Sequence, residues 1–224
     1  MSPIELLWHV SIRFIVSMVV VGAILFVSAG SVRYWNGWLF MGALFVPMTI
    51  ALVLLYRKDH SLLEKRIRMH EKEKEQRAYV KWSLLWFLIS FAVPGLDYRF
   101  GWSDVPEWLA LVSVIVMVSG YTLFIVAMLQ NSFASRVIEI QTNQRLVDTG
   151  LYSVVRHPMY MAATIMYTAC PFVLGSYYAL IPAILLPLLL AYRIRNEEKV
   201  LRVGLTGYSE YTQRVKFRLI PYVW

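Results

Sequence analysis

Two polar clusters near the C-terminal end of the sequence carry residue types that bind and transform small molecules. The first is Arg-His-Pro at residues 156–158, directly before an apolar run, and the second is Arg-Ile-Arg-Asn-Glu-Glu at residues 193–198, directly after the next one. Guanidinium groups bind carboxylates through paired hydrogen bonds, imidazole exchanges a proton near neutral pH, and carboxylates bind cations. This set of groups favours a site for a charged ligand.

The two apolar runs between these clusters predict a helical hairpin. Pro158 stands at a favoured first-turn position of a helix, because proline lacks an N–H that would be unpaired there in any case. The runs Met159–Leu174 and Tyr177–Tyr192 are separated by Gly175-Ser176, which is a turn signal. Each run has about 16 residues, or roughly 24 Å of helix. The chain therefore returns to its starting level, and the hairpin would bring the two polar clusters together.

A purely structural explanation competes with the functional one. Arg156 could anchor a helix end at a membrane surface, and residues 193–198 could be the charged end of a membrane helix. Arg193 and Glu197, however, are four residues apart and share a helix face, and Glu198 adds a second carboxylate beside them. Ionisable groups at membrane depth are costly and tend to be functional. Both clusters at one end of one hairpin favour a functional site, which we expect on the cytoplasmic side.

The composition is that of an integral membrane protein. Mean hydropathy is +0.55 and only 16% of the 224 residues are charged, which is too apolar for an ordinary soluble fold. A bilayer core about 30 Å thick takes roughly 20 apolar residues per helix. We predict an all-α, polytopic membrane protein with about six transmembrane helices, or five if a short run, such as the third, is re-entrant. The six runs are Ser11–Ala29, Gly37–Tyr56, Trp82–Leu96, Trp108–Gln130, Met159–Leu174 and Tyr177–Tyr192.

The distribution of basic residues predicts the orientation of these helices. With six spans and a cytoplasmic N-terminus, 20 of the 22 Lys and Arg residues fall on the cytoplasmic side, as the positive-inside rule requires. Both termini would then be cytoplasmic. Topology and attraction to anionic membrane lipids explain the net charge of +8, so nucleic-acid binding is not expected. Cys170 is the sole cysteine, and its apolar setting indicates a packing role.

We divide the chain into an N-terminal transmembrane region, residues 1–130, and a C-terminal region, residues 131–224, which holds a polar loop, the hairpin and a tail. The first region contains a mixed-charge cytoplasmic segment, residues 57–81. His60 and His70 in this segment lack further ligands at metal-binding spacing. No metal site is therefore expected.

Two connections between the predicted helices differ in character. Pro94-Gly95 and Pro106 predict the two ends of a short outer loop that carries Asp97. The connection over residues 131–158 is long and polar. Because long structured loops are more often functional than idle, this second connection is the better candidate to border a site.

The C-terminal region resembles the isoprenylcysteine carboxyl methyltransferase family, a group of membrane methyltransferases related to the phospholipid methyltransferases. The similarity rests on QRLVDTGLYSVVRHPMY, the apolar hairpin, RIRNEE, and a tail with GYSEYTQRV and LIP, and it covers about residues 131–221. It implies an enzyme that takes S-adenosylmethionine from the cytosol and a lipophilic or prenylated acceptor from the bilayer. Two positions depart from the family's usual pattern: Ala162 replaces a common glycine, and Gln144 replaces a histidine that prenylcysteine enzymes often have.

The resemblance also implies roles for individual residues. Arg193 would hold the acceptor, and Glu197 would contact the cofactor. The two polar clusters themselves suggest two further assignments. Arg156 joins the cofactor site, and Glu198 joins Arg193 and Glu197 as a candidate catalytic residue. The remaining implied cofactor contacts are Gln141, Gln144, Arg145, Leu146, Val147, Tyr152, His157, Pro158, Met159 and Tyr160.

The chemistry of the acceptor is the main open question at this stage. A carboxylate is ionised at neutral pH and needs no base, so carboxyl O-methylation fits an arginine contact. An amine or thiol acceptor, as in phospholipid N- or thiol S-methylation, would need a base, for which Glu198 and His157 are candidates. An NADPH-dependent, sterol-reductase-like enzyme and a non-catalytic binding or transport protein are two further hypotheses. Since the sequence has no G-x-G-x-x-G turn, the loop and hairpin would have to hold any nucleoside cofactor.

Overall fold

The protein is helical throughout the part of the chain that the structure, a computed structural model, describes: residues 2–58, 63–64, 74–134, 138 and 140–224. Each of the six predicted apolar runs lies in one long helix, apart from a few terminal residues of the last two runs. The predicted pair His60 and His70 lies outside the described residues. The helices are α1 (Pro3–Ala29), α2 (Trp35–Lys58), α4 (Lys74–Phe100), α5 (Glu107–Gln130), the 3-10 turn η1 (Gly150–Ser153), α6 (Pro158–Val173), α7 (Leu180–Gly204) and α8 (Tyr208–Arg214).

Three helices among the described residues, α1, α2 and α5, are long and apolar enough to cross a membrane. The other long helices are shorter or carry charged ends: α6 has only 16 residues, α4 begins in the charged segment, and the C-terminal part of α7 contains Arg-Asn-Glu-Glu-Lys. The chain is therefore a helical membrane protein. Six spans with cytoplasmic termini stay a prediction.

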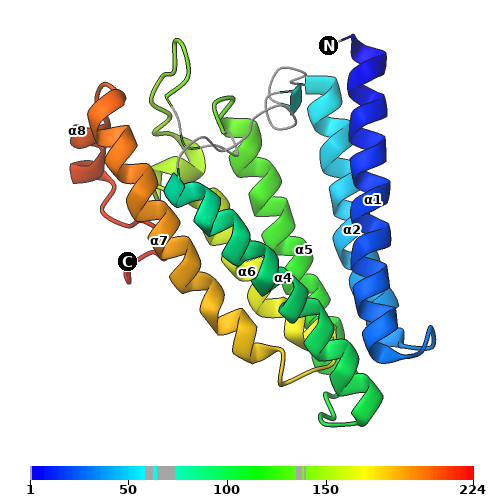
Figure 1. Cartoon of the computed structure of the whole chain (residues 1–224). Coiled ribbons are helices and arrows are strands. Elements are labelled where there is room, and N and C mark those ends of the chain that lie inside the picture. The colour runs from blue at the N-terminus through cyan, green and yellow to red at the C-terminus, as the bar shows by residue number, and fades with distance from the viewer. Residues whose placement is uncertain (1, 59–62, 65–73, 135–137, 139) are drawn as a thin grey trace.

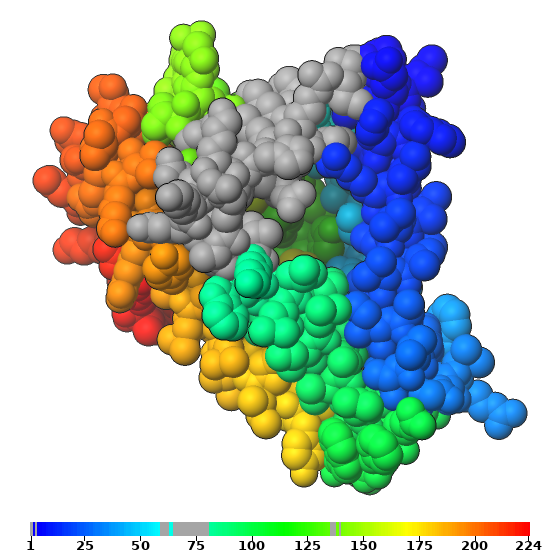
Figure 2. Space-filling view, viewed as in Figure 1, coloured from blue at the N-terminus to red at the C-terminus, as the bar shows by residue number. Residues whose placement is uncertain are grey.

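Successive long helices alternate in direction. In Figure 1 the connections α1–α2, α4–α5 and α6–α7 lie at the lower end of the molecule, whereas the N-terminus, α8 and the segment between α5 and α6 lie at the upper end. Figure 2 shows that α1 and α4 approach each other at the lower end, and that atoms of α5 are visible between them higher up. The turn after α6 uses Gly175 with a φ of 70°, as the Gly-Ser signal predicts.

The predicted loop after Pro94-Gly95 is wrong. Helix α4 continues through both residues, and the connection to α5 is confined to residues 101–106. Gly95 lies where α4 meets α1: a Cβ there would be 1.9 Å from Ser28 Oγ and 2.8 Å from the backbone oxygen of Leu25. A proline inside a helix removes one backbone hydrogen bond, and packing on neighbouring helices can compensate for it. The Pro-Gly pair therefore marks a close helix contact and not a turn.

The correction changes the surroundings of Asp97, which lies on α4 and is 1% exposed. Its carboxylate accepts hydrogen bonds from the backbone N–H of Ser103 (2.7 Å), from the Ser103 hydroxyl (2.6 Å) and from the Ser176 hydroxyl. The Tyr34 hydroxyl donates to the carbonyl of Leu174 nearby in the same turn. Because a buried carboxylate needs such donors, Asp97 ties the end of α4 to the α6–α7 turn.

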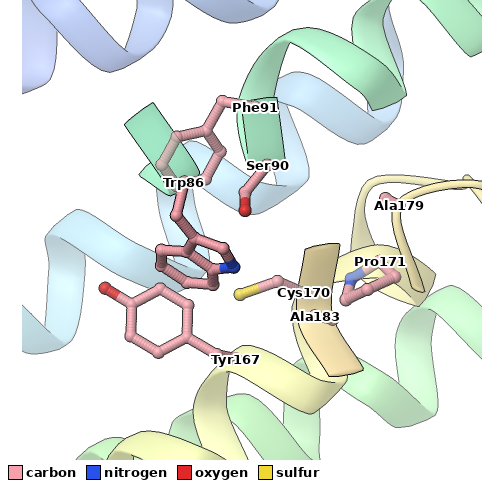
Figure 3. A pocket seen from close by; sticks show the side chains of 8 residues that line it. All are labelled: Trp86, Ser90, Phe91, Tyr167, Cys170, Pro171, Ala179 and Ala183. Carbon is pink, nitrogen blue, oxygen red and sulfur yellow. The ribbon is translucent and has the colours of Figure 1, made fainter. Parts of the chain in front are cut away.

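A small cavity lies between α4, α6 and α7, and Figure 3 shows its mainly apolar and aromatic walls. Trp86 donates a 2.6 Å hydrogen bond from Nε1 to the carbonyl of Pro182. Cys170 is buried in this wall, as expected of a packing residue. It lies ten residues after Tyr160, or about 15 Å further along α6, so the cavity is separate from the polar clusters. The lining residues are Trp86, Ser90, Phe91, Tyr167, Cys170, Pro171, Ala179 and Ala183.

Gly95→Ala should weaken the contact between α1 and α4. The new methyl group would force the two backbones apart, which costs about 1–3 kcal/mol in overpacked sites. We expect the melting temperature in detergent to fall by roughly 3–10 °C. Gly42→Ala is the matched control, because a Cβ at Gly42 has no neighbour within 4 Å. Equal melting temperatures for the two variants would contradict the close approach of α1 and α4.

Candidate functional site

The first polar cluster lies at the start of α6, where His157 precedes the helix and Pro158 occupies its first turn, as the sequence predicts. The backbone N–H groups of Arg156 and His157 donate to the carbonyls of Phe217 and Arg218, both at 2.9 Å. Arg156 and His157 are only 7% and 5% exposed. The tail after α8 therefore holds this cluster in place and shields it from water.

The second polar cluster reaches the first through Glu198 on α7, which is 3% exposed. Glu198 Oε1 accepts a 2.7 Å hydrogen bond from Arg156 Nε, and Oε2 accepts a 2.9 Å hydrogen bond from Arg218 Nε. The Arg156 guanidinium also donates to the carbonyls of Val215 (2.7 Å) and Lys216 (3.0 Å). One buried carboxylate thus joins α6, α7 and the tail. The hairpin prediction that both clusters meet is confirmed.

The two arginines keep Glu198 ionised. Burial raises its pKa, but the close approach of His157 and the hydrogen bonds from Arg156 and Arg218 outweigh burial and lower the pKa from 4.5 to about 2. His157 Nε2 lies 3.5 Å from Glu198 Oε1. A carboxylate with so low a pKa is a weak base at neutral pH. Glu198 is therefore suited to hold its neighbours in place and poorly suited to remove a proton.

A second network runs through Tyr160 on the first turn of α6. Arg193 Nε donates to the Tyr160 hydroxyl at 2.8 Å, and this hydroxyl donates to Glu197 Oε2 at 2.7 Å. The rings of His157 and Tyr160 stack with centroids 5.7 Å apart, and His157 Nδ1 lies 3.8 Å from Glu197 Oε1. The Glu197 side chain is 26% exposed, whereas that of Glu198 is 4% exposed. Glu197 is thus oriented by its neighbours and still open on one side.

The loop before η1 is packed against the end of the chain. Ile140 and Leu146 contact a cluster of buried residues that spans the end of α7 and α8, and a Cβ at Gly204 would lie 2.5 Å from Ile140 Cγ1. The Tyr211 hydroxyl donates a 2.6 Å hydrogen bond to the carbonyl of Tyr152. The cluster consists of Leu205, Tyr208, Tyr211 and Val215. Helix α8 therefore fixes the loop that the sequence assigns to cofactor binding.

The other predicted contacts are assembled to different degrees. Gln144 Oε1 accepts a 2.9 Å hydrogen bond from the backbone N–H of Gln141, whose side chain donates to the carbonyl of Phe133. Pro158 is buried, Leu146, Val147 and Met159 are half-buried, and Arg145 is exposed. Within the described residues, the hydrogen bonds and ion pairs of the two networks involve none of these last five side chains. His157, Tyr160, Arg193, Glu197, Glu198 and Arg156 form the connected core of the site.

Sequence reasoning missed the contribution of the tail. Arg218 shares Glu198 with Arg156 and lies over the Trp224 ring at 5.3 Å from its centroid, but no motif predicts these contacts. The carbonyls of residues 215–218 bind the first cluster through the backbone, and a backbone carbonyl leaves no signature in sequence. The tyrosines of GYSEY are visible as a motif, without a predicted role.

A comparison with protein families matches residues 110–203 to the model of the isoprenylcysteine carboxyl methyltransferase family. This part of the chain is similar to the isoprenylcysteine carboxyl methyltransferase family. The match covers nearly all of α5, the loop, η1, α6 and α7 up to its penultimate residue. It starts earlier than the resemblance read from the motifs and ends before α8. No curated protein matches the chain.

The similarity to the isoprenylcysteine carboxyl methyltransferase family agrees with the site in one important respect. The matched residues include both polar networks except for the tail residue Arg218 and the carbonyls beside it. Together with the long apolar helices α1, α2 and α5, the match supports a membrane methyltransferase.

Glu198→Gln should destabilise the protein strongly at neutral pH. Removing the charge leaves two guanidinium groups without their shared carboxylate, and breaking a buried ion pair costs about 3 kcal/mol or more, which corresponds to roughly 10 °C in melting temperature. Because the pKa of Glu198 is about 2 in the folded chain against 4.5, its stabilisation is complete above pH 4.5 and fades as the pH falls toward 2. The difference from wild type should therefore shrink on acidification.

Asp148→Asn is the matched control for this measurement. Asp148 pairs with Arg214 at 2.7 Å, but that arginine side chain is 63% exposed, and exposed pairs contribute about 0–1 kcal/mol. Thermal unfolding in detergent at about pH 6 and about pH 3 separates the two cases. A Glu198→Gln deficit that is the same at both pH values would contradict the depressed pKa.

Proposed function

We propose that the chain transfers a methyl group from S-adenosylmethionine to the carboxylate of a lipophilic, isoprenylcysteine-like acceptor. The observation that carries the proposal is the chain of contacts Arg193–Tyr160–Glu197 within the region that matches the methyltransferase family. These contacts place the guanidinium of Arg193, which can bind a carboxylate, near the partly exposed carboxylate of Glu197, which can bind a cation. Arg193 would suit an anionic acceptor, and Glu197 would suit the ammonium group of the methyl donor.

Two buried polar atoms support the fit of the cofactor. Among the described residues Gln141 Oε1 has no hydrogen-bond partner, and His157 Nε2 lies 3.5 Å from Glu198 Oε1 without forming a well-aligned hydrogen bond. Leaving such atoms unpaired is costly, so each unpaired buried group calls for a partner. Both belong to residues that the sequence assigns to the cofactor. The amines and hydroxyls of a nucleoside cofactor offer partners to both atoms.

In this proposal Glu197 binds the ammonium group of the cofactor, and Tyr160 holds Glu197 in the required orientation through the 2.7 Å hydrogen bond. The other parts of the cofactor are held by Gln141, Tyr152 and His157. Bound S-adenosylmethionine supplies a methyl group that its sulfonium already activates. The protein's task is then to bind, align and exclude water, since alignment alone can account for a large part of such a rate enhancement.

Arg193 takes the carboxylate of the acceptor. It is 7% exposed and lies on α7 beside the open carboxylate of Glu197, and a planar guanidinium can bind a carboxylate bidentately. The state of Glu198 favours this acceptor class. An amine or thiol acceptor needs a base, and the buried, doubly paired Glu198 is a weak one. We therefore assign Glu198 to positioning, which leaves His157 as the base if the acceptor is not a carboxylate.

The proposed site opens on the cytoplasmic side of the membrane. The positive-inside pattern supports this orientation, because the basic end of α2, with Arg57 and Lys58, and the charged end of α7 lie at the same end of the bundle as the site. Arg156 and His157 then stand at the interface where a soluble cofactor and a membrane-bound acceptor can both arrive. Anionic lipids would surround this end.

Tyr160→Phe should weaken cofactor binding about tenfold. The variant keeps the ring beside His157 and removes the hydroxyl that links Arg193 to Glu197, and a lost hydrogen bond to a charged group is worth about 1.5 kcal/mol. Calorimetric titration with S-adenosylhomocysteine measures the change. Tyr167→Phe, on the same helix in the wall of the separate cavity, should bind like wild type. Failure of well-folded wild-type protein to bind would defeat the proposed function and favour an NADPH-dependent or non-catalytic protein.

Arg193→Lys should reduce methyl transfer about 100-fold, because a lysine keeps the charge but loses the planar fork that aligns a carboxylate. S-adenosylhomocysteine affinity should change less than about threefold. Transfer can be followed with a radiolabelled methyl donor and a prenylated cysteine derivative. Arg195→Lys, an exposed position two residues further along α7, is the control. Parallel loss of transfer and cofactor affinity in Arg193→Lys would contradict the division of roles between Arg193 and Glu197.

A further inference from the structure

We propose that Tyr208 is an additional cofactor-binding residue, whose hydroxyl forms a hydrogen bond with the nucleoside–amino acid cofactor. The inference rests on the proposed function and deepens it, since Tyr208 lies on α8, beyond the region that matches the family. Tyr208 is 3% exposed, and its hydroxyl has no hydrogen-bond partner among the described residues. A buried hydroxyl without a partner is unfavourable in the absence of a ligand.

The neighbouring tyrosine provides an internal comparison. Tyr211 lies one turn further along α8 and is 2% exposed, and its ring centroid is 5.7 Å from that of Tyr208. The Tyr211 hydroxyl donates to the carbonyl of Tyr152 at 2.6 Å. The same short helix therefore buries two phenols, one paired within the protein and one not. Packing alone would be served equally well by phenylalanine at position 208.

The position of Tyr208 relates the unpaired hydroxyl to the site. The ring belongs to the cluster that packs against Leu146, a predicted cofactor contact, and the glycine before Tyr208 has a Cβ position 3.7 Å from Leu146 Cδ2. Burial raises the pKa of Tyr208, and the charges of Glu198 and Glu197 on α7 raise it further, so both carboxylates lie within electrostatic reach of the phenol. Tyr208 thus packs against the cofactor loop and interacts electrostatically with the carboxylate pair.

The chemistry of this position selects the kind of group that Tyr208 can bind. The phenol stays neutral at neutral pH, so it can donate one hydrogen bond and accept others. Glu198 already accepts hydrogen bonds from Arg156 and Arg218. It therefore has little capacity to accept another one from the Tyr208 hydroxyl. A hydroxyl or carboxylate of the cofactor is a suitable partner. The nucleoside and the amino-acid parts of the cofactor each provide one.

The test compares Tyr208→Phe with Tyr211→Phe in the full chain in detergent. Without ligand, Tyr208→Phe should melt at the wild-type temperature or slightly above it, because it removes an unpaired hydroxyl, whereas Tyr211→Phe should melt lower, because it removes a paired one. Calorimetric titration with S-adenosylhomocysteine should show an affinity about five- to tenfold lower for Tyr208→Phe.

Methylthioadenosine, which lacks the amino-acid part, identifies the group that is bound. Equal losses of affinity for both ligands assign the contact to the nucleoside, and a loss for S-adenosylhomocysteine alone assigns it to the amino-acid part.

Two results would overturn the inference while leaving the proposed function intact. The first is wild-type affinity of Tyr208→Phe for S-adenosylhomocysteine. The second is a ligand-free melting temperature of Tyr208→Phe that falls as far as that of Tyr211→Phe, which would show that the hydroxyl has a structural partner. If wild-type protein does not bind S-adenosylhomocysteine, the proposed function and the inference both fail.

Discussion

The architecture of the site depends on one buried carboxylate with two guanidinium partners. Glu198 on α7 holds Arg156 before α6 and Arg218 in the tail, so three segments that are distant in sequence meet at a single charge. Once buried, none of these groups can lose its partner cheaply, because an unpaired charge in a low-dielectric interior is strongly unfavourable. Two cations around one anion also leave the cluster positive. Its surroundings therefore favour a second anion, and Glu197 is placed next to it.

Adjacent carboxylates acquire different properties here because a helix turns by about 100° per residue. Glu198 faces the arginines and is closed off, whereas Glu197 faces Tyr160 and stays partly exposed. Each is held by the chemistry of its partners, guanidinium in one case and phenol in the other. A pair that looks redundant in sequence thus separates into one group that fixes the fold locally and one that can meet a ligand.

The sequence predicts the helices well and the tertiary contacts of the site only in part. The predictions of the helices and of the α6 boundaries are accurate because they depend on local chemistry. Long apolar runs mark the helices, Pro158 marks the start of α6, and Gly175 marks the turn after it. Pro94-Gly95 misleads because the same residues that favour a turn also permit close packing of two helices. The pairing of Glu198 with Arg218 is not predictable, since it depends on how the tail folds back and not on helical spacing. The meeting of the two polar clusters is predictable, because it follows from the lengths of two helices.

The backbone contacts of the tail have a consequence for how the protein is made. Arg156 donates to the carbonyl of Val215, 59 residues later in the chain, and His157 donates to that of Arg218. Because synthesis runs from the N-terminus to the C-terminus, Arg156 is made before the residues that supply its carbonyl partners. The contacts around Arg156 and His157 are thus completed only when the tail folds back onto the start of α6.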